Sequence, residues 1–78
     1  MPRWTVYSQP GCTLCETFLA ELAELLGAQA ASVAVVDISD DAELEARYKT
    51  KIPVLTADDA FVCCYRVDAE RVRAYLAD

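Results

Sequence analysis

A C-x-x-C sequence at residues 12–15 constrains this chain more than any other feature. It stands between a short β-type run at residues 4–7 and a long helical pattern that begins at Cys12, with a Gln9-Pro10-Gly11 turn before it. The first turn of a helix has unpaired N–H groups and a partial positive charge, and both favour a thiolate over a thiol. Because the thiolate is the nucleophile of disulfide exchange, the sequence predicts redox chemistry on a strand–turn–helix unit.

The length and the charge of the chain restrict its partners. A length of 78 residues predicts one domain over residues 1–78, and the apolar share of 55% is ample for a small core. The formal net charge is −6, whereas nucleic acids and anionic membranes attract clusters of lysine and arginine. We therefore expect neither a nucleic acid nor a membrane as a partner, and we expect a monomer.

The N-terminal residues bear on the cellular compartment. Residues 1–4 lack the apolar core of a signal peptide, and no stretch of the sequence is long enough to cross a membrane. We therefore expect a cytoplasmic protein. Structural disulfides are rare in the cytoplasm, where cysteine pairs tend to be catalytic or metal-bound.

Hydrophobic periodicity predicts an α/β chain with the order β-α-β-α-β-β-α. The first helix spans residues 12–26 and ends before Gly27, and residues 32–38 form the near-continuous apolar run of a buried parallel strand. The other expected elements are strands at 3–8, 54–57 and 60–66, a short helix at 41–48 and a last helix after Asp68. The apolar side chains on the expected buried helix faces are Leu14, Phe18, Leu22, Leu25 and Leu26, then Val72, Tyr75 and Leu76.

Local signals mark the ends of these elements. Asp40 and Glu43 have the spacing of a capping box for the short helix, and Asp68 is the expected N-cap of the last helix. Asp58-Asp59 is expected to form the turn of a β-hairpin.

Cys63 and Cys64 are adjacent in the last expected strand, where successive side chains point to opposite faces. We expect one of them in the core with Phe61 and Tyr65 and the other beside Val62. A packing role is favoured over an auxiliary redox thiol, because neighbouring cysteines need a strained turn to form a disulfide. The chain contains no histidine and its second cysteine pair is not C-x-x-C, so no metal site is expected.

Two segments carry a resemblance to a known family. Residues 6–15 hold the strand end and the C-x-x-C, and residues 48–55 hold an Ile52-Pro53 sequence about forty residues later. The whole order of elements resembles the thioredoxin fold, and the length and spacing resemble glutaredoxins, especially short bacterial glutaredoxin-like proteins of uncharacterised function. The resemblance implies a four-stranded mixed sheet with helices on both faces. It also implies a cis Pro53, with the backbone of Ile52 pairing with an extended substrate.

The resemblance has departures that bear on glutathione. Gln9 stands where glutaredoxins that use glutathione usually carry a lysine or arginine, and residues 65–68 stand where they carry Gly-Gly-x-Asp. Asp68 matches that motif, and Lys51 is a cation that could attract a carboxylate. Glutathione therefore stays open as a co-substrate, and no tightly bound cofactor is expected. The candidate substrate-binding residues are Gln9, Thr13, Leu14, Lys51, Ile52, Pro53 and Asp68.

The reactive pair has two assigned roles. Cys12 is the candidate nucleophile at the edge of the helix, against the alternative of a structural cap. Cys15 is the candidate resolving thiol, which attacks the mixed disulfide at Cys12, against the alternative of a small buried apolar residue.

The sequence thus predicts a small thiol–disulfide oxidoreductase that acts on a protein or small-molecule disulfide. The first alternative is a redox-inactive thioredoxin-fold module that binds a partner protein through the apolar edge of Leu14, Ile52 and Val54. A second alternative is a thiol-based redox or metal sensor.

Overall fold

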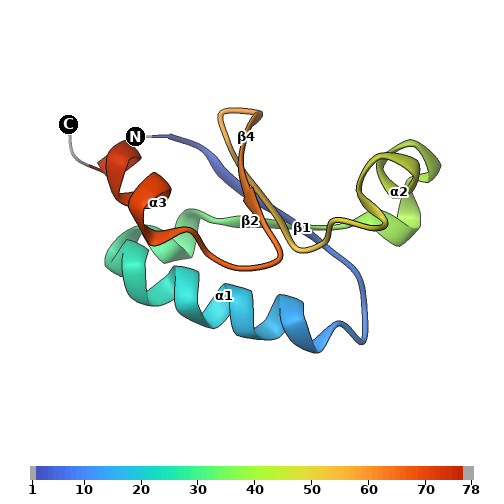
Figure 1. Cartoon of the computed structure of the whole chain (residues 1–78), viewed down its shortest axis with the longest axis horizontal. Coiled ribbons are helices and arrows are strands. Elements are labelled where there is room, and N and C mark those ends of the chain that lie inside the picture. The colour runs from blue at the N-terminus through green and yellow to red at the C-terminus, as the bar shows by residue number, and fades with distance from the viewer. Residues whose placement is uncertain (1, 77–78) are drawn as a thin grey trace.

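A four-stranded mixed sheet of order β2-β1-β3-β4 forms the frame of the protein in the computed structural model (Figure 1). The structure describes residues 2–76, so the predicted domain limits at Met1 and Asp78 lie outside the described residues. The elements are β1 (Trp4–Ser8), α1 (Thr13–Leu26), β2 (Ala34–Asp37), α2 (Ala42–Tyr48), β3 (Val54–Ala57), β4 (Ala60–Cys64) and α3 (Ala69–Leu76). This order confirms the predicted sequence of strands and helices. Two 3₁₀ segments, η1 (Gly27–Ser32) and η2 (Ile38–Asp40), were not predicted.

Strand β1 joins the two halves of the sheet. It runs parallel to β2 and antiparallel to β3, and Tyr7 pairs with both Val36 and Val54. Strands β3 and β4 form the expected hairpin, whose turn residues Asp58 and Asp59 have φ values of 49° and 69°. Two successive positive φ values match the right-handed twist of a two-residue hairpin.

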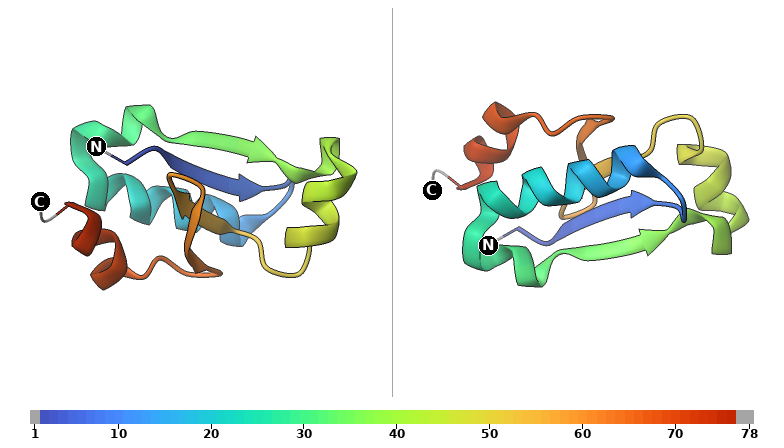
Figure 2. Two further views of the ribbon diagram at one scale, coloured as in Figure 1. Left: turned by 90° about the horizontal axis from the view of Figure 1, so that it is seen from above. Right: turned by 90° about the horizontal axis from the view of Figure 1, so that it is seen from below.

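The core lies between one face of the sheet and the helices α1 and α3. Trp4 and Val6 of β1 are buried against Phe18 and Leu22 of α1, and Val72 of α3 completes the cluster. Figure 2 shows α1 along this face, with α2 beyond one end of the sheet. α2 meets the opposite face at that end, where the rings of Tyr48 and Tyr7 stack 4.7 Å apart. The predicted arrangement of a mixed sheet with helices on both faces is confirmed.

The prediction that the second strand is buried was wrong. β2 is the edge of the sheet and is shorter than expected, because Ser32 belongs to η1 and Ile38 begins η2. Val35 is 54% exposed in this strand. An apolar run is also compatible with an edge strand that has only one neighbour, and this alternative cannot be told from a buried strand by composition.

The cap of the short helix also differs from the prediction. Asp41, rather than Asp40, is the N-cap of α2, and its carboxylate accepts the N–H groups of Glu43 and Leu44 at 2.9 and 3.2 Å. Asp40 is the last residue of η2 and is therefore not free to adopt the extended conformation of a cap.

The end of β4 departs from strict alternation. Leu55 pairs with Cys63 and Thr56 pairs with Phe61, so Val62 is an extra residue in a β-bulge. As a result Val62 and Cys63 are both buried, whereas Phe61 is exposed. The prediction that Phe61 and Tyr65 share the core with a cysteine was therefore wrong, and β4 ends at Cys64 rather than at Arg66.

The expected helix faces are buried only in part. Phe18, Leu22, Leu26 and Val72 are buried as predicted, whereas Leu14 and Tyr75 are exposed. The ring of Tyr75 makes an edge-to-face contact with Trp4 at 5.5 Å between centroids. Each of these two exposed residues lies near an end of its helix.

Candidate redox site

The two cysteines of the C-x-x-C form a disulfide in the first turn of α1. Their Cα atoms are 5.2 Å apart. Cys12 is the extended N-cap residue, with φ −91° and ψ 100°, and its Sγ accepts the backbone N–H of Cys15 at 3.1 Å. The sequence folds this way because Gly11 takes a φ of 78°, which lets the chain turn from β1 into the helix.

The two sulfur-bearing residues differ in exposure. Cys15 is only 3% exposed and faces the core, whereas Cys12 is partly accessible at the helix edge. Once the disulfide is reduced, the Cys15 N–H and the positive end of α1 would both stabilise a thiolate at Cys12. The geometry therefore allows Cys12 to meet a substrate and keeps Cys15 within reach of it.

The loop before β3 lies at the same end of the sheet. The Ile52–Pro53 peptide bond is cis, and the N–H groups of Lys51 and Ile52 both donate to the Tyr48 carbonyl, at 2.7 and 3.1 Å. Because Tyr7 pairs with Val54 in antiparallel register, the buried Pro53 lies at the end of β1 that leads to Cys12. Figures 1 and 2 show the start of α1 and this loop at one end of the molecule.

The remaining predicted site residues fall into two groups. Gln9, Thr13 and Lys51 are exposed around this end, and Leu14 is 40% exposed. Asp68 caps α3 as predicted: its carboxylate accepts the Arg71 N–H at 3.2 Å and pairs with the Arg71 Nε at 3.4 Å.

Tyr65 also belongs to this region, although the sequence predicted it to be a core residue of a strand and did not indicate it as a site residue. Its φ is 66°, its N–H donates to the Pro53 carbonyl at 2.9 Å, and its hydroxyl donates to the carbonyl of Thr50. It thus connects the end of β4 to the loop that carries Pro53. A signal was present in the sequence, because Tyr65 stands where glutaredoxins carry a glycine and such a glycine indicates a positive φ.

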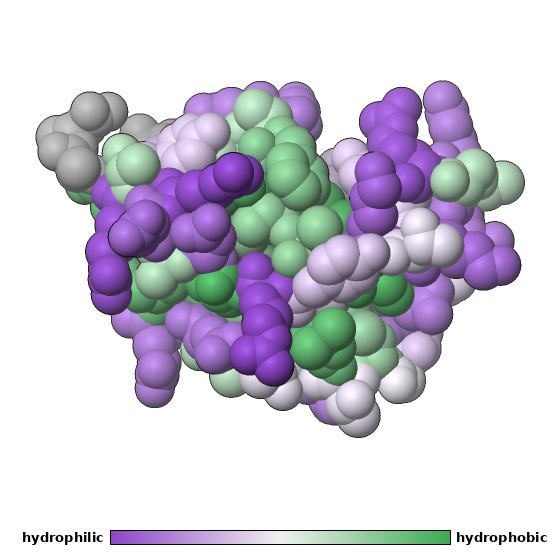
Figure 3. All heavy atoms as spheres, in the orientation of Figure 1, coloured by the Kyte–Doolittle hydropathy of each residue, from purple (hydrophilic) through white to green (hydrophobic). Residues whose placement is uncertain are grey.

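A groove of about 100 Å³ lies between α1 and the segment after β4. Its lining residues are Leu14, Thr17, Phe18, Glu21, Tyr65 and Arg66. Leu14 belongs to the C-x-x-C and links the groove to the start of α1, although neither cysteine lines the groove. In Figure 3 apolar residues gather over the β3–β4 hairpin, with hydrophilic residues over α2 and α3 on either side.

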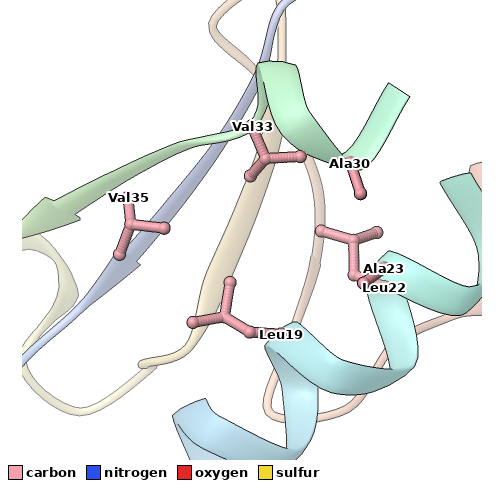
Figure 4. Close-up of a pocket in the computed structure, with 6 residues that line it drawn as sticks. All are labelled: Leu19, Leu22, Ala23, Ala30, Val33 and Val35. Carbon is pink, nitrogen blue, oxygen red and sulfur yellow. The ribbon is translucent and has the colours of Figure 1, made fainter. Parts of the chain in front are cut away.

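A second hollow, of about 220 Å³, lies away from the disulfide along α1 and β2 (Figure 4). The six residues that line it are Leu19, Leu22, Ala23, Ala30, Val33 and Val35, and none of these side chains is polar. No side chain in it could orient a polar ligand, so it is not a candidate reaction site.

The second cysteine pair is not bonded. Cys63 and Cys64 are free thiols, Cys63 is buried, and its burial raises the pKa of its thiol above the usual value. Within residues 2–76, no three cysteine, aspartate or glutamate side chains gather in a way that could hold a metal ion. None of the described helices is long and apolar enough to span a membrane.

A mixed sheet of this topology, with a C-x-x-C disulfide at the start of its first helix and a cis proline before its third strand, defines the thioredoxin fold. Within that fold the chain belongs to the family described as glutaredoxin-like domain (DUF836), whose model matches residues 3–77. The predicted relationship to short glutaredoxin-like proteins is thereby confirmed.

Solved structures of similar proteins support this assignment. Protein Ne2328 from Nitrosomonas europaea is 32% identical with a TM-score of 0.83, over 95% of this chain and 89% of that protein. The structural genomics target XcR50 from X. campestris is 34% identical with a TM-score of 0.71, over 95% of each chain. Deadhead, a germline-specific thioredoxin of Drosophila melanogaster, is 18% identical with a TM-score of 0.52, over 95% of this chain and 76% of that one, and shows the fold alone. No curated protein gives a significant match to the sequence.

Proposed function

We propose that the protein is a thiol–disulfide oxidoreductase in which Cys12 is the nucleophile and Cys15 is the resolving thiol. The observation that carries this proposal is the Cys12–Cys15 disulfide at the N-terminus of α1, with the second cysteine buried and the first accessible. A helix N-terminus favours the thiolate that exchange requires.

The reaction proceeds in two exchanges. In the dithiol form, the Cys12 thiolate attacks one sulfur of a substrate disulfide, forms a mixed disulfide and releases the other sulfur as a thiolate, which takes up a proton. Cys15, after losing its proton, then attacks the Sγ of Cys12 and releases the second substrate thiol. The substrate gains two electrons, and the protein is left with the Cys12–Cys15 disulfide seen here. An external thiol reductant restores the dithiol.

The substrate in this proposal is a protein or small-molecule disulfide, with glutathione as the candidate co-substrate and the cytoplasm as the compartment. Gln9, Thr13 and Lys51 are exposed and are proposed to contact the substrate. The backbone of the loop at Ile52 is proposed to align an extended substrate segment beside Cys12.

The test is a redox titration of the purified protein against glutathione buffers, with thiols mapped by mass. We expect a reversible two-electron couple of Cys12 and Cys15 between about −200 and −270 mV, the range of reducing oxidoreductases. The Cys15→Ser variant is expected to accumulate a mixed disulfide at Cys12 when it meets a disulfide substrate. If Cys12 and Cys15 do not interconvert between dithiol and disulfide in any of the glutathione buffers, the protein is a binding module rather than an oxidoreductase.

A further inference from the structure

The segment after β4 contains a strained residue. Tyr65 has a φ of 66°, and the Arg66 N–H donates to the Cys64 carbonyl at 2.8 Å, so Tyr65 is the central residue of a γ-turn of the rare, positive-φ kind. A bulky side chain at positive φ is a genuine outlier. Such strain persists where the surroundings over-determine it, and it is concentrated at ligand clamps and active sites.

The surroundings of Tyr65 do over-determine it. Its backbone N–H is bonded to the Pro53 carbonyl and its hydroxyl to the Thr50 carbonyl, so both ends of the residue are held against the loop before β3. Tyr65 as a whole is nevertheless 47% exposed. The two bonds therefore hold the residue against the loop, while part of its surface stays accessible to a partner.

Tyr65 lines the groove that Leu14 of the C-x-x-C also lines. Leu14 lies one residue before Cys15, and Phe18 lines the groove as well. Glu21 and Arg66, one acid and one base, are the charged residues that line it. Opposite charges give the groove no net attraction for an anion, whereas Leu14, Phe18 and Tyr65 suit an apolar group.

The size of the groove indicates what kind of molecule it receives. Sites that enclose a whole small molecule usually measure about 300–1,000 Å³. This groove measures about 100 Å³, which suits one side chain of a larger partner. The rest of such a partner would lie outside the groove, across the loop that Tyr65 holds.

We propose that Tyr65 and Leu14 form a receptor for an apolar side chain next to the reacting cysteine of a polypeptide, so that the preferred substrate class is a polypeptide disulfide. This inference rests on the proposed oxidoreductase function and adds its specificity. Tyr65 acts by contact with the substrate and takes no part in the exchange of sulfur bonds.

The test follows the oxidation of pre-reduced protein by excess disulfide in single-turnover mixing, with the Cys12–Cys15 disulfide measured by acid quench and mass. The probes are two short peptides with one internal disulfide, identical except for leucine or serine beside a cysteine, together with oxidised glutathione and bis(2-hydroxyethyl) disulfide. The dependence of the rate on peptide concentration separates the half-saturating concentration from the limiting rate.

For the Tyr65→Ala variant we expect the second-order rate constant with the leucine peptide to fall about tenfold, which corresponds to about 1.4 kcal/mol. The fall should come from a higher half-saturating concentration of the peptide, with the limiting rate unchanged. The rate constants for the serine peptide and both small disulfides should stay within about twofold. Phe61→Ala is the matched control, because Phe61 is an exposed aromatic residue of β4 that does not line the groove.

Two further variants guard against misfolding. Tyr65→Gly removes the ring and also the strain of a positive φ, so it should lose the leucine preference without losing stability. Tyr65→Phe keeps the ring and should keep most of the preference. An equal fall for all four probes, an unchanged leucine preference in Tyr65→Ala, or faster oxidation of the wild type by glutathione disulfide than by the leucine peptide would each overturn the inference. If no probe oxidises the wild-type pair, the oxidoreductase proposal itself fails.

Discussion

The cysteine pair at the start of α1 and the pair at the end of β4 differ in their backbone. Cys12 and Cys15 are one helical turn apart, which brings their side chains together as a disulfide. Cys63 and Cys64 are adjacent in an extended strand, where successive side chains diverge, and both remain free. The comparison shows that spacing and local conformation, rather than the number of thiols, decide which pair forms a disulfide.

The largest expected difference between the two pairs is in activity. Cys12→Ser should lower the rate of disulfide exchange by more than about 10³-fold, because it removes the atom that forms the covalent intermediate. Cys64→Ser should leave the rate within about twofold. Steady-state reduction of a peptide disulfide with dithiothreitol as the electron source measures both. Retained activity in Cys12→Ser would assign disulfide exchange to other thiols and would contradict the expected difference between the two cysteine pairs.

A smaller difference is expected in stability. Cys63 is 6% exposed and lies in the core, so Cys63→Ser places a hydroxyl in an apolar site and should lower the free energy of unfolding by about 1–3 kcal/mol. Cys64→Ser, at a half-buried position, should cost less than about 0.5 kcal/mol. Urea unfolding in the presence of a reductant compares the two variants. Equal losses in the free energy of unfolding would show that the positions of Cys63 and Cys64 do not differ in burial.

The smallest expected difference concerns reactivity within the second pair. Burial raises the pKa of the Cys63 thiol, so at pH 8 this residue has less thiolate than an ordinary cysteine. Iodoacetamide should therefore modify Cys63 at least about tenfold more slowly than Cys64 in the reduced protein. The difference should vanish in guanidinium chloride, where burial is lost. Mass mapping of the two sites over time gives both rates, and equal rates in the native protein would contradict the assigned burial.

Much of the fold was predictable because its signals are local. The helix of residues 13–26, its end at Gly27, the strand of residues 54–57 and the Asp58-Asp59 turn each follow from side chains within a few positions. The helix N-terminus at the C-x-x-C was predictable for the same reason. Of the candidate site, the sequence therefore predicted the cysteine pair of the C-x-x-C and its place at the start of a helix.

The rest depended on contacts between distant residues. Whether the strand around Val35 lies in the centre of the sheet or at its edge depends on which strands it pairs with. No local sequence pattern indicates this pairing. The burial of Cys63 beside Val62 depends on a bulge in the pairing with Leu55 and Thr56. Strict alternation, which is all that the sequence offers for a strand, assigned those faces incorrectly.

The sequence by itself determined the order of the elements, the reactive pair of cysteines and the family, because these depend on spacing along the chain. Tertiary structure alone decided that Tyr65 would reach the loop at Thr50 and form a groove with Leu14. These residues are far apart in the sequence, and only the packing of β4 beside β3 and over α1 brings them together. Contacts between residues that are far apart in the sequence depend on the whole fold, so a pattern within one segment cannot predict them.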